Sequence, residues 1–262
     1  MNMDLDLKNK TIVVTGGASG IGAAIVNGLV QEGAIPVVID KSRVGLQSFA
    51  QAHSSLFKRK MIETYLCDLS DPLDTQRVLS ELNLDHTDIY GLVNNAGAND
   101  GIGLNSDVAS FMSSLHKNLV HYFQMTQGLV ARIKQAQGSI INISSKVAVT
   151  GQGGTSGYAA AKGAINALTR EWAVDLAPFN VDVNCIIPAE VNTPQYASWL
   201  QTQEGERRLP AILKKINLGT RLTTPEEIAD YVLFLLSQKS SHTTGQLLFV
   251  DGGYTHLDDS KN

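Results

Sequence analysis

Stretches rich in apolar residues alternate along the chain with stretches in which apolar residues recur at helical spacing. A strand covered by helices on both faces is apolar throughout, whereas an amphipathic helix has one apolar face. Strands that alternate with helices are joined by right-handed crossovers, so the pattern predicts an α/β fold with a doubly wound parallel sheet. The predicted strands are residues 11–15, 35–39, 61–67, 89–93, 139–143 and 181–187, with a last strand inside 245–253.

Polar residues stand where four of these strands are expected to end. Ligands of open parallel sheets bind outside the carboxyl ends of the strands, so we expect these four side chains to share one site. An acid that leaves a strand can cap the next helix or contact an adenine ring, and the sequence leaves both roles open for Asp68. The four residues are Asp40, Asp68, Asn95 and Ser145.

A glycine-rich turn connects the first strand to a helix expected over residues 23–31. The turn runs from Gly16 to Gly22 with the spacing T-G-x-x-x-G-x-G. Glycines let the backbone approach a pyrophosphate closely, and the helix N-terminus favours its negative charge. A merely flexible turn is the alternative, but a strand, this turn and a helix in succession favour a dinucleotide site.

Asp40 follows the second strand, about 20 positions beyond the glycine turn. A carboxylate there can accept hydrogen bonds from an adenosine ribose and repel a 2′-phosphate, which predicts NAD over NADP. Lys41 and Arg43 could soften this preference by binding phosphate, so NADP stays possible. Ser19 inside the turn is not basic, which removes one usual partner of a 2′-phosphate.

Tyr158 and Lys162 follow the fifth strand in a helical stretch, where residues four apart share one helix face. An ammonium beside a phenol favours the phenolate, so we expect the pKa of Tyr158 to lie below its usual value of about 10. Such a phenol could act as a general base, and Ser145 could hold the reacting oxygen. An ordinary helix face with a solvated lysine would give the same Y-x-x-x-K pattern.

Composition excludes several kinds of protein. The chain has 262 residues, 43% apolar and 18% charged, and its net charge of −4 argues against nucleic acid or an anionic membrane as partner. No apolar run approaches the ~18–20 residues of a membrane span, and the polar, acidic residues 1–10 do not resemble a signal peptide. Cys67 and Cys185 suit free buried thiols and the six histidines lack ligand spacing, so we expect a cytoplasmic protein without a metal site.

Four motifs together resemble the short-chain dehydrogenase/reductase family. They are the glycine turn, N-N-A-G at 94–97, a serine thirteen residues before Y-x-x-x-K, and P-x-x-x-x-T at 188–193. The resemblance covers nearly the whole chain and implies one Rossmann-type domain over residues 1–262, with a seven-stranded parallel sheet and helices on both faces. It also implies a nicotinamide cofactor, a homotetramer, and a lid-like helical insertion at about 194–219.

The resemblance also implies catalytic roles for Asn118, Ser145, Tyr158 and Lys162. Asn118 is either a polar residue inside a helix or a helix-kink asparagine whose carbonyl holds a water that relays protons to Lys162. Ser144 competes with Ser145, but counting back from Tyr158 favours Ser145. The implied cofactor contacts are Gly16, Ser19, Gly20, Ile21, Gly22, Asp40, Asp68, Leu69, Asn95, Ala96, Gly97, Tyr158, Lys162, Val191 and Thr193.

Longer phrases resemble the L-fucose dehydrogenase group of this family, which oxidises the anomeric carbon of fucose-like aldoses to the lactone. They include residues 94–104, 144–164 and 187–196. A polar pocket agrees with a sugar substrate, since a steroid or acyl pocket would be more apolar. The alternatives are a hydroxysteroid or small secondary-alcohol dehydrogenase or ketoreductase, and a dinucleotide-binding regulator without turnover. The substrate candidates are Asn99, Asp100, Ser145, Gln152, Thr155, Glu190 and Trp199.

Three residues near this site carry a charge or an aromatic ring. Lys146 is either a substrate contact or a solvated charge, and we favour the solvated charge. Trp199 either stacks on a sugar face or packs in the interior. A carboxylate beside a nicotinamide is costly unless it binds something, and sugar hydroxyls are natural partners for Glu190.

Overall fold

The apolar runs form one seven-stranded parallel sheet, as predicted, in the computed structural model, which describes residues 4–58 and 61–257. The strand order is β3-β2-β1-β4-β5-β6-β7. The predicted domain spans residues 1–262, so both of its ends reach beyond the described residues. The strands are β1 (Thr11–Thr15), β2 (Ile35–Asp40), β3 (Glu63–Leu66), β4 (Gly91–Asn94), β5 (Ser139–Ile143), β6 (Asp182–Pro188) and β7 (Leu247–Val250).

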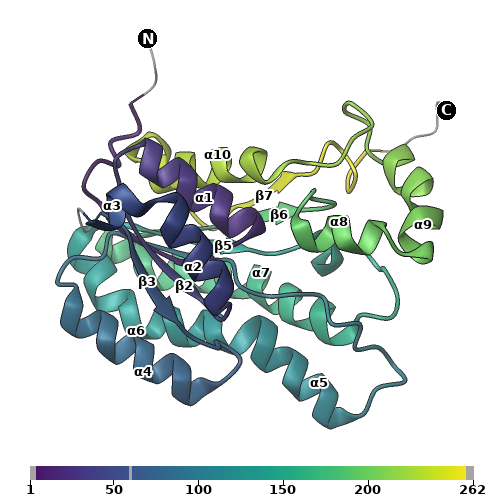
Figure 1. Ribbon diagram of the computed structural model, residues 1–262, viewed down its shortest axis with the longest axis horizontal. Coiled ribbons are helices and arrows are strands. Elements are labelled where there is room, and N and C mark those ends of the chain that lie inside the picture. Colours follow the sequence, from purple (N-terminus) through teal and green to yellow (C-terminus); the bar gives the residue numbers. More distant parts are fainter. Residues whose placement is uncertain (1–3, 59–60, 258–262) are drawn as a thin grey trace.

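Helices connect the strands and cover both faces of the sheet, with α1 and α10 above it and α4 and α6 below it in Figure 1. Within the described ranges, no helix is both long enough and apolar enough to cross a bilayer. The helices are α1 (Gly20–Gln31), α2 (Arg43–Ala52), α3 (Ser54–Lys58), α4 (Pro72–Asp85), α5 (Val108–Leu115), α6 (His121–Ala136), α7 (Ser156–Leu176), α8 (Pro194–Leu200), α9 (Gln203–Lys214) and α10 (Pro225–Leu236).

Successive strand residues point into two separate apolar cores, as the pleat requires. Ile12 and Val14 lie in the core with residues of α1, α2 and α10. Val13 lies in the opposite core with residues of α4, α6 and α7. Because both faces are covered, the central strands are rich in apolar residues, which is why the sequence predicts them well.

The helix after the glycine turn, α1, packs against α10, which forms late in the chain. Gly28 lies at this contact, where an added Cβ would come within 3.0 Å of Leu233 Cδ2. Gly28 gives the two helices room to approach closely, since an added methyl group would require the leucine side chain to shift. Elements near the two ends of the chain therefore pack together beside the glycine turn.

The strand order reverses between β1 and β4, so a cleft is expected at the carboxyl ends of these strands. Buried amides fix the ends of β4 and β5 there. Asn94 Nδ2 donates to Asn142 Oδ1 over 3.0 Å, and Asn142 Nδ2 donates to Thr169 Oγ1 of α7 over 3.0 Å. Both asparagines are fully buried, so hydrogen bonds help to set the strand register at the cleft.

Some element boundaries differ from the sequence predictions. The first helix begins at Gly20 and not at residue 23, because the end of the glycine turn is already helical. Strand β3 is shorter than the predicted 61–67, since this edge strand pairs only with β2 over Glu63–Leu66. The insertion at 194–219 contains two helices, and Thr202 begins the second by accepting a hydrogen bond from Gly205 N over 3.1 Å.

Candidate active site

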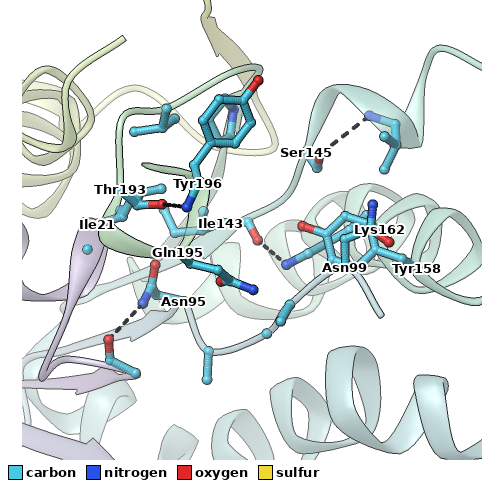
Figure 2. Close-up of a pocket in the computed structure, with 18 of the residues that line it drawn as sticks. Ile21, Asn95, Asn99, Ile143, Ser145, Tyr158, Lys162, Thr193, Gln195 and Tyr196 are labelled. Atoms are coloured by element: carbon cyan, nitrogen blue, oxygen red, sulfur yellow. Dashed lines mark hydrogen bonds between the residues drawn. The ribbon is translucent and has the colours of Figure 1, made fainter. Parts of the chain in front are cut away.

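A cleft of about 1070 Å³ lies at the carboxyl ends of the strands, and residues of α8 and α9 line part of it. Figure 2 shows some of the lining side chains. Gly22, Asp100 and Asn118 are predicted site residues that do not line it. The predicted residues that line it are Gly16, Ser19, Gly20, Ile21, Asp40, Asp68, Leu69, Asn95, Ala96, Gly97, Asn99, Ser145, Gln152, Thr155, Tyr158, Lys162, Glu190, Val191, Thr193 and Trp199.

The glycine turn is shaped to receive an anion. Gly16 and Gly20 have positive φ angles of 65° and 54°, which favour glycine. Gly22 lies behind the turn, and a Cβ there would come within 2.0 Å of Gly16 O, so the turn can fold this tightly only around glycine. Ser19 makes no side-chain cap bond, which leaves the first N–H groups of α1 available beside the cleft. These groups fit a dinucleotide pyrophosphate.

Asn95 supports the glycine turn through its side chain. Asn95 Nδ2 donates to Thr15 O over 2.9 Å and to Gly16 O over 3.2 Å. In return, the backbone N–H groups of Asn95 and Ala96 donate to Thr15 Oγ1 over 2.9 and 3.1 Å. The N-N-A-G motif therefore links the end of β4 to the end of β1, and Thr15 is a partner that the sequence analysis missed.

Asp40 stands at the cleft with its carboxylate held by backbone groups. Its Oδ2 accepts from Ala18 N over 3.1 Å, and its Oδ1 accepts from Ser42 N over 2.9 Å. Lys41 also lines the cleft, whereas Arg43, at the start of α2, lies outside the lining. The carboxylate is therefore a fixed negative charge at the place where an adenosine ribose is expected.

Asp68 lines the cleft and does not cap the next helix. That helix, α4, is capped by Asp71, which accepts from Leu73 N over 2.9 Å. Asp68 accepts instead from the Ser70 hydroxyl over 2.6 Å, and this hydrogen bond holds the pKa of Asp68 below its usual value. Capping of the next helix is therefore excluded for Asp68, and its contact with an adenine stays a prediction.

Tyr158, Lys162 and Ser145 meet at the end of β5 (Figure 2). Lys162 is 2% exposed, and its Nζ donates to Ile143 O over 2.7 Å. The same Nζ lies 5.6 Å from the centre of the Tyr158 ring. Ser144 and Ser145 both line the cleft, but the Ser144 hydroxyl proton is engaged, because Ser144 Oγ donates to Lys162 O over 3.1 Å. This arrangement favours Ser145 over Ser144 as the serine that contacts a substrate.

Burial controls the protonation of Tyr158 and Lys162. Burial raises the pKa of Tyr158 to about 12, although the Ser145 hydroxyl opposes it, and burial lowers the pKa of Lys162 to about 7. The prediction that the pKa of Tyr158 lies below about 10 is therefore wrong for these side chains alone, because burial outweighs the effect of a neighbouring ammonium. A further positive charge beside the phenol would favour the phenolate.

Asn118 lies in a π-helical segment, His116–Val120, between α5 and α6. Its Oδ1 accepts from Ala98 N over 2.8 Å, and its Nδ2 donates to Ser114 O over 3.1 Å. The irregular helix agrees with the predicted kink, and π-bulges are frequent at functional sites. The side chain is fully buried outside the cleft lining, so it ties the loop after β4 to this helix. The water relay stays a prediction.

Lys146 forms a buried ion pair with Glu190, and the prediction of a solvated charge is wrong. The side chains are 8% and 11% exposed, and Lys146 Nζ lies 3.9 Å from the centre of the Tyr254 ring. Glu190 lines the cleft, but its charge is matched by Lys146 and does not require a sugar. Asp100 has other partners. Its Oδ2 lies 3.7 Å from Lys117 Nζ, and its Oδ1 accepts from Ser114 Oγ over 3.0 Å.

Helices α8 and α9 bring groups to the cleft that the sequence analysis missed. Figure 2 shows Gln195 of α8 pointing into the cleft, while the Tyr196 ring points away from Tyr158. The Tyr196 ring packs against Trp199 with 5.3 Å between ring centres. Arg208 of α9 lies 5.6 Å from the centre of the Trp199 ring and lines the cleft. The i,i+4 spacing of Glu204 and Arg208 in α9 is a sequence signal for Arg208 alone.

Comparisons with known proteins agree with this geometry. A family model described as enoyl-(acyl carrier protein) reductase matches residues 16–255. The 3-oxoacyl-(acyl-carrier-protein) reductase FabG of Thermotoga maritima is 34% identical over 249 residues, which are 94% of this chain and 98% of the relative. The L-fucose dehydrogenase of Bos taurus is 31% identical over 263 residues, 97% of this chain and 92% of the relative. The crystal structure of the Cj0485 dehydrogenase is 44% identical with a TM-score of 0.91, and 99% of each chain is covered.

Proposed function

The chain belongs to the short-chain dehydrogenase/reductase family, and we propose that it transfers a hydride from C1 of an L-fucose-like aldose to NAD, giving the lactone. The family carries out oxidation and reduction at CH–OH groups with NAD or NADP, and this coarser activity follows from membership. The sugar, the direction of the reaction and the preference for NAD are the parts that we propose.

The polar lining around Tyr158 is the observation that carries the proposal. Asn99, Gln152, Thr155 and Glu190 all line the cleft together with Ser145 and Tyr158. A site that hydrogen-bonds hydroxyls discriminates strongly against analogues that lack them, because its polar groups are then left unpaired. A sugar with several hydroxyls satisfies such a lining better than a steroid or an acyl chain does.

The cofactor would be held by the groups that the fold already fixes. The N–H groups at the start of α1 would bind the pyrophosphate, Asp40 the adenosine ribose, and Asp68 with Leu69 the adenine. Val191 and Thr193 would contact the nicotinamide end, as the family resemblance implies. When bound, the oxidised nicotinamide supplies the hydride acceptor and a positive charge.

The residues near the end of β5 would accept the proton of the substrate hydroxyl and pass it on. The sugar would bind with its C1 hydroxyl between Ser145 and Tyr158. Tyr158 would accept the hydroxyl proton, and Ser145 would stabilise the negative charge that develops on the oxygen. Lys162 would favour the phenolate through its charge. Asn118 would hold the water that carries the proton away.

Asp40 is the basis for proposing NAD as the preferred cofactor. Its carboxylate is fixed by Ala18 N and Ser42 N, so it cannot turn aside easily for a 2′-phosphate. Lys41 beside it would offset part of the repulsion, and NADP is therefore expected as a poorer cofactor. The ratio of kcat/KM for the two cofactors measures this preference directly.

A substrate sweep tests the proposal. Purified protein is assayed with L-fucose, D-arabinose, L-galactose and a steroid alcohol, each with NAD and with NADP, by the absorbance of the reduced cofactor. Highest kcat/KM for one of the three sugars with NAD is the expected result. Activity confined to the steroid alcohol, or no activity with any sugar, would overturn the substrate assignment.

A second candidate is a ketoreductase that uses the same serine, tyrosine and lysine. The 34% identity to the 3-oxoacyl-(acyl-carrier-protein) reductase of Thermotoga maritima favours it, since that relative is as similar to the chain as the sugar-oxidising one. The sweep is therefore extended to a 3-oxoacyl thioester with NADH and NADPH. Reduction of the thioester without oxidation of any sugar would establish this second function instead.

Assembly and cell location are further parts of the proposal. We expect a homotetramer in the cytoplasm on the basis of family membership. Size-exclusion chromatography with light scattering at micromolar concentration should then give about 113 kDa, four times the 28.2 kDa chain. A mass of 28.2 kDa would contradict the tetramer, and fractionation of the source cells tests the location.

A further inference from the structure

A second buried tyrosine lies against the active-site lysine. Tyr122 of α6 is fully buried, and its hydroxyl donates to Ile143 O over 2.9 Å. Lys162 Nζ donates to the same hydroxyl over 3.0 Å and to Ile143 O over 2.7 Å. The lysine nitrogen, the phenol oxygen and the carbonyl oxygen therefore form a closed triangle of hydrogen bonds, of which Figure 2 shows the bond from Lys162 to Ile143.

The number of protons in this triangle fixes which group donates. A phenol has one hydroxyl proton, and Tyr122 gives it to Ile143 O, so the phenol oxygen can only accept from Lys162. A carbonyl oxygen has two lone pairs and can accept from both Tyr122 and Lys162. An ammonium has three protons, so a protonated Lys162 keeps one for a ligand in the cleft that it lines.

The titratable side chains that interact with Lys162 are neutral. From α6, His121 has its pKa lowered to about 3 by burial, and burial also holds the pKa of Tyr122 well above its usual value. From β6, Cys185 has its pKa raised to about 12 by burial, so it remains a thiol. From α7, Tyr158 is likewise neutral, and Asp100 in the loop after β4 acts on Tyr158.

No carboxylate in the described part of the chain lies within ion-pair distance of Lys162. A buried ammonium without an anionic partner depends on hydrogen-bond acceptors to remain charged. The two acceptors found here are the Ile143 carbonyl and the Tyr122 hydroxyl. The carbonyl is part of the backbone and cannot be removed by substitution, so the hydroxyl is the one that a variant can test.

We propose that Tyr122 is a positioning residue, whose hydroxyl holds Lys162 in its protonated form by accepting a hydrogen bond from the ammonium. The proposal rests on the proposed function, since it concerns the lysine that acts on Tyr158. Loss of the hydroxyl disfavours the ammonium, and a neutral lysine no longer favours the phenolate of Tyr158. Tyr122 thus acts on the base through Lys162 without touching the substrate.

Tyr122→Phe removes the hydroxyl and keeps the ring, and Tyr90→Phe is the matched control. Tyr90 is also buried, but its hydroxyl accepts from Gln238 Nε2 over 3.1 Å, outside the cleft lining. The dependence of kcat on pH is measured with the best substrate of the sweep. Because hydrogen bonds to charged groups are strong, the acid limb of Tyr122→Phe should move up by about one pH unit. At pH 7 kcat should fall about tenfold and recover at high pH, whereas Tyr90→Phe should show no shift.

A folded Tyr122→Phe protein whose acid limb coincides with that of the wild type would overturn the proposal, whatever its kcat. The result is separate from the proposed function, which Tyr158→Phe tests. Loss of turnover in Tyr158→Phe with an unmoved profile in Tyr122→Phe refutes only the role of Tyr122.

A direct titration of Lys162 tests the proposal without an assay of activity. Lysines labelled with ¹³C at Cε are followed by NMR against pH, and Lys162 is assigned with Lys162→Met. The Lys162 resonance should titrate at lower pH in Tyr122→Phe than in the wild type, and equal titration would refute the proposal even if no substrate is found. If Tyr122→Phe does not fold, 3-fluorotyrosine at position 122 keeps the hydroxyl but weakens it as an acceptor. A smaller shift in the same direction is then expected, and its absence would refute the proposal.

Discussion

The Lys146 ammonium is paired with the Glu190 carboxylate, and this buried ion pair joins the loop after β5 to the loop after β6. Lys146 directly follows Ser145, and Glu190 directly precedes Val191. The pair therefore connects the segment that is expected to hold the substrate oxygen to the segment that is expected to hold the nicotinamide. The Tyr254 ring, 3.9 Å from the ammonium, covers the pair.

Removing one charge of this ion pair should destabilise the protein more than removing both charges. Lys146→Met or Glu190→Gln alone leaves one buried charge unpaired, which should lower the free energy of unfolding by about 3 kcal/mol. The double variant should lie within about 1 kcal/mol of the wild type, because no unpaired charge remains. Urea unfolding at pH 7.5 measures all three.

Two comparisons make the ion-pair experiment decisive. Glu81→Gln, which breaks an exposed pair with Arg77, should change stability by no more than about 0.5 kcal/mol. If Glu190 also binds a sugar hydroxyl, the double variant should show a KM about tenfold higher despite its recovered stability. Single and double variants of equal stability would show that the two charges do not interact.

Tyr158→Phe should abolish turnover while leaving cofactor binding intact. The substitution keeps the ring and removes the group that accepts the proton, so kcat should fall by about 10³-fold. NADH affinity, measured by fluorescence titration, should change by less than about twofold because the ring packing is kept. Tyr231→Phe, at an exposed tyrosine of α10, serves as control. Wild-type turnover in Tyr158→Phe would show that another group is the base.

Asp40→Ser should shift the cofactor preference toward NADP. Serine keeps an acceptor near Ala18 N but removes the charge that opposes a 2′-phosphate. The ratio of kcat/KM for NADP to that for NAD should rise by about tenfold or more, the effect of about 1.4 kcal/mol. Lys41→Ala should move the ratio in the opposite direction, since it removes a cation from the cleft. An unchanged ratio in Asp40→Ser would exclude the predicted role of this carboxylate.

Asp182→Asn should stabilise the protein at pH 7.5 but not at pH 4. Burial raises the pKa of Asp182 from 3.8 to about 6, so between these values the folded chain binds more protons than the unfolded chain. Its contribution to stability therefore falls as the pH rises from 3.8 to about 6 and stays low above that. Removing the charge should restore about 1–2 kcal/mol at pH 7.5, after allowance for partial exposure. Urea unfolding at both pH values tests this against exposed Asp230→Asn, and equal changes at both values would refute it.

The sheet could be predicted from the sequence because its strands are buried on both faces. Residues 11–15 and 139–143 are mostly apolar and almost wholly buried, and they form β1 and β5 with the predicted bounds. The edge strand β3 is only partly buried, and its length depends on how far β2 extends beside it. The division of 194–219 into two helices depends on the cap at Thr202, a local signal that a coarse reading of periodicity does not include.

The sequence predicts only those residues of the site that belong to motifs of fixed spacing. The residues of the glycine turn, Asp40, Tyr158 and Lys162 have fixed spacings, and the fold brings them to one cleft. The ion pair of Lys146 does not belong to a motif of fixed spacing. Its partner, Glu190, lies 44 residues away in the sequence, and the two side chains come together only in the folded structure. The pKa values of Tyr158 and Lys162 could not be predicted from the sequence either, because they depend mainly on how deeply the fold buries each side chain.

The contact between α1 and α10 has a consequence for the synthesis of the protein. During translation, α1 emerges early, yet the helix that covers its apolar face is made roughly 190 residues later, about 10–40 s at the usual elongation rates. Through that interval the nascent chain exposes the apolar side of its glycine-turn helix to solvent. Ribosome-bound chaperones should therefore be retained on this chain until Leu233 has left the exit tunnel, and the nucleotide site should form only after release.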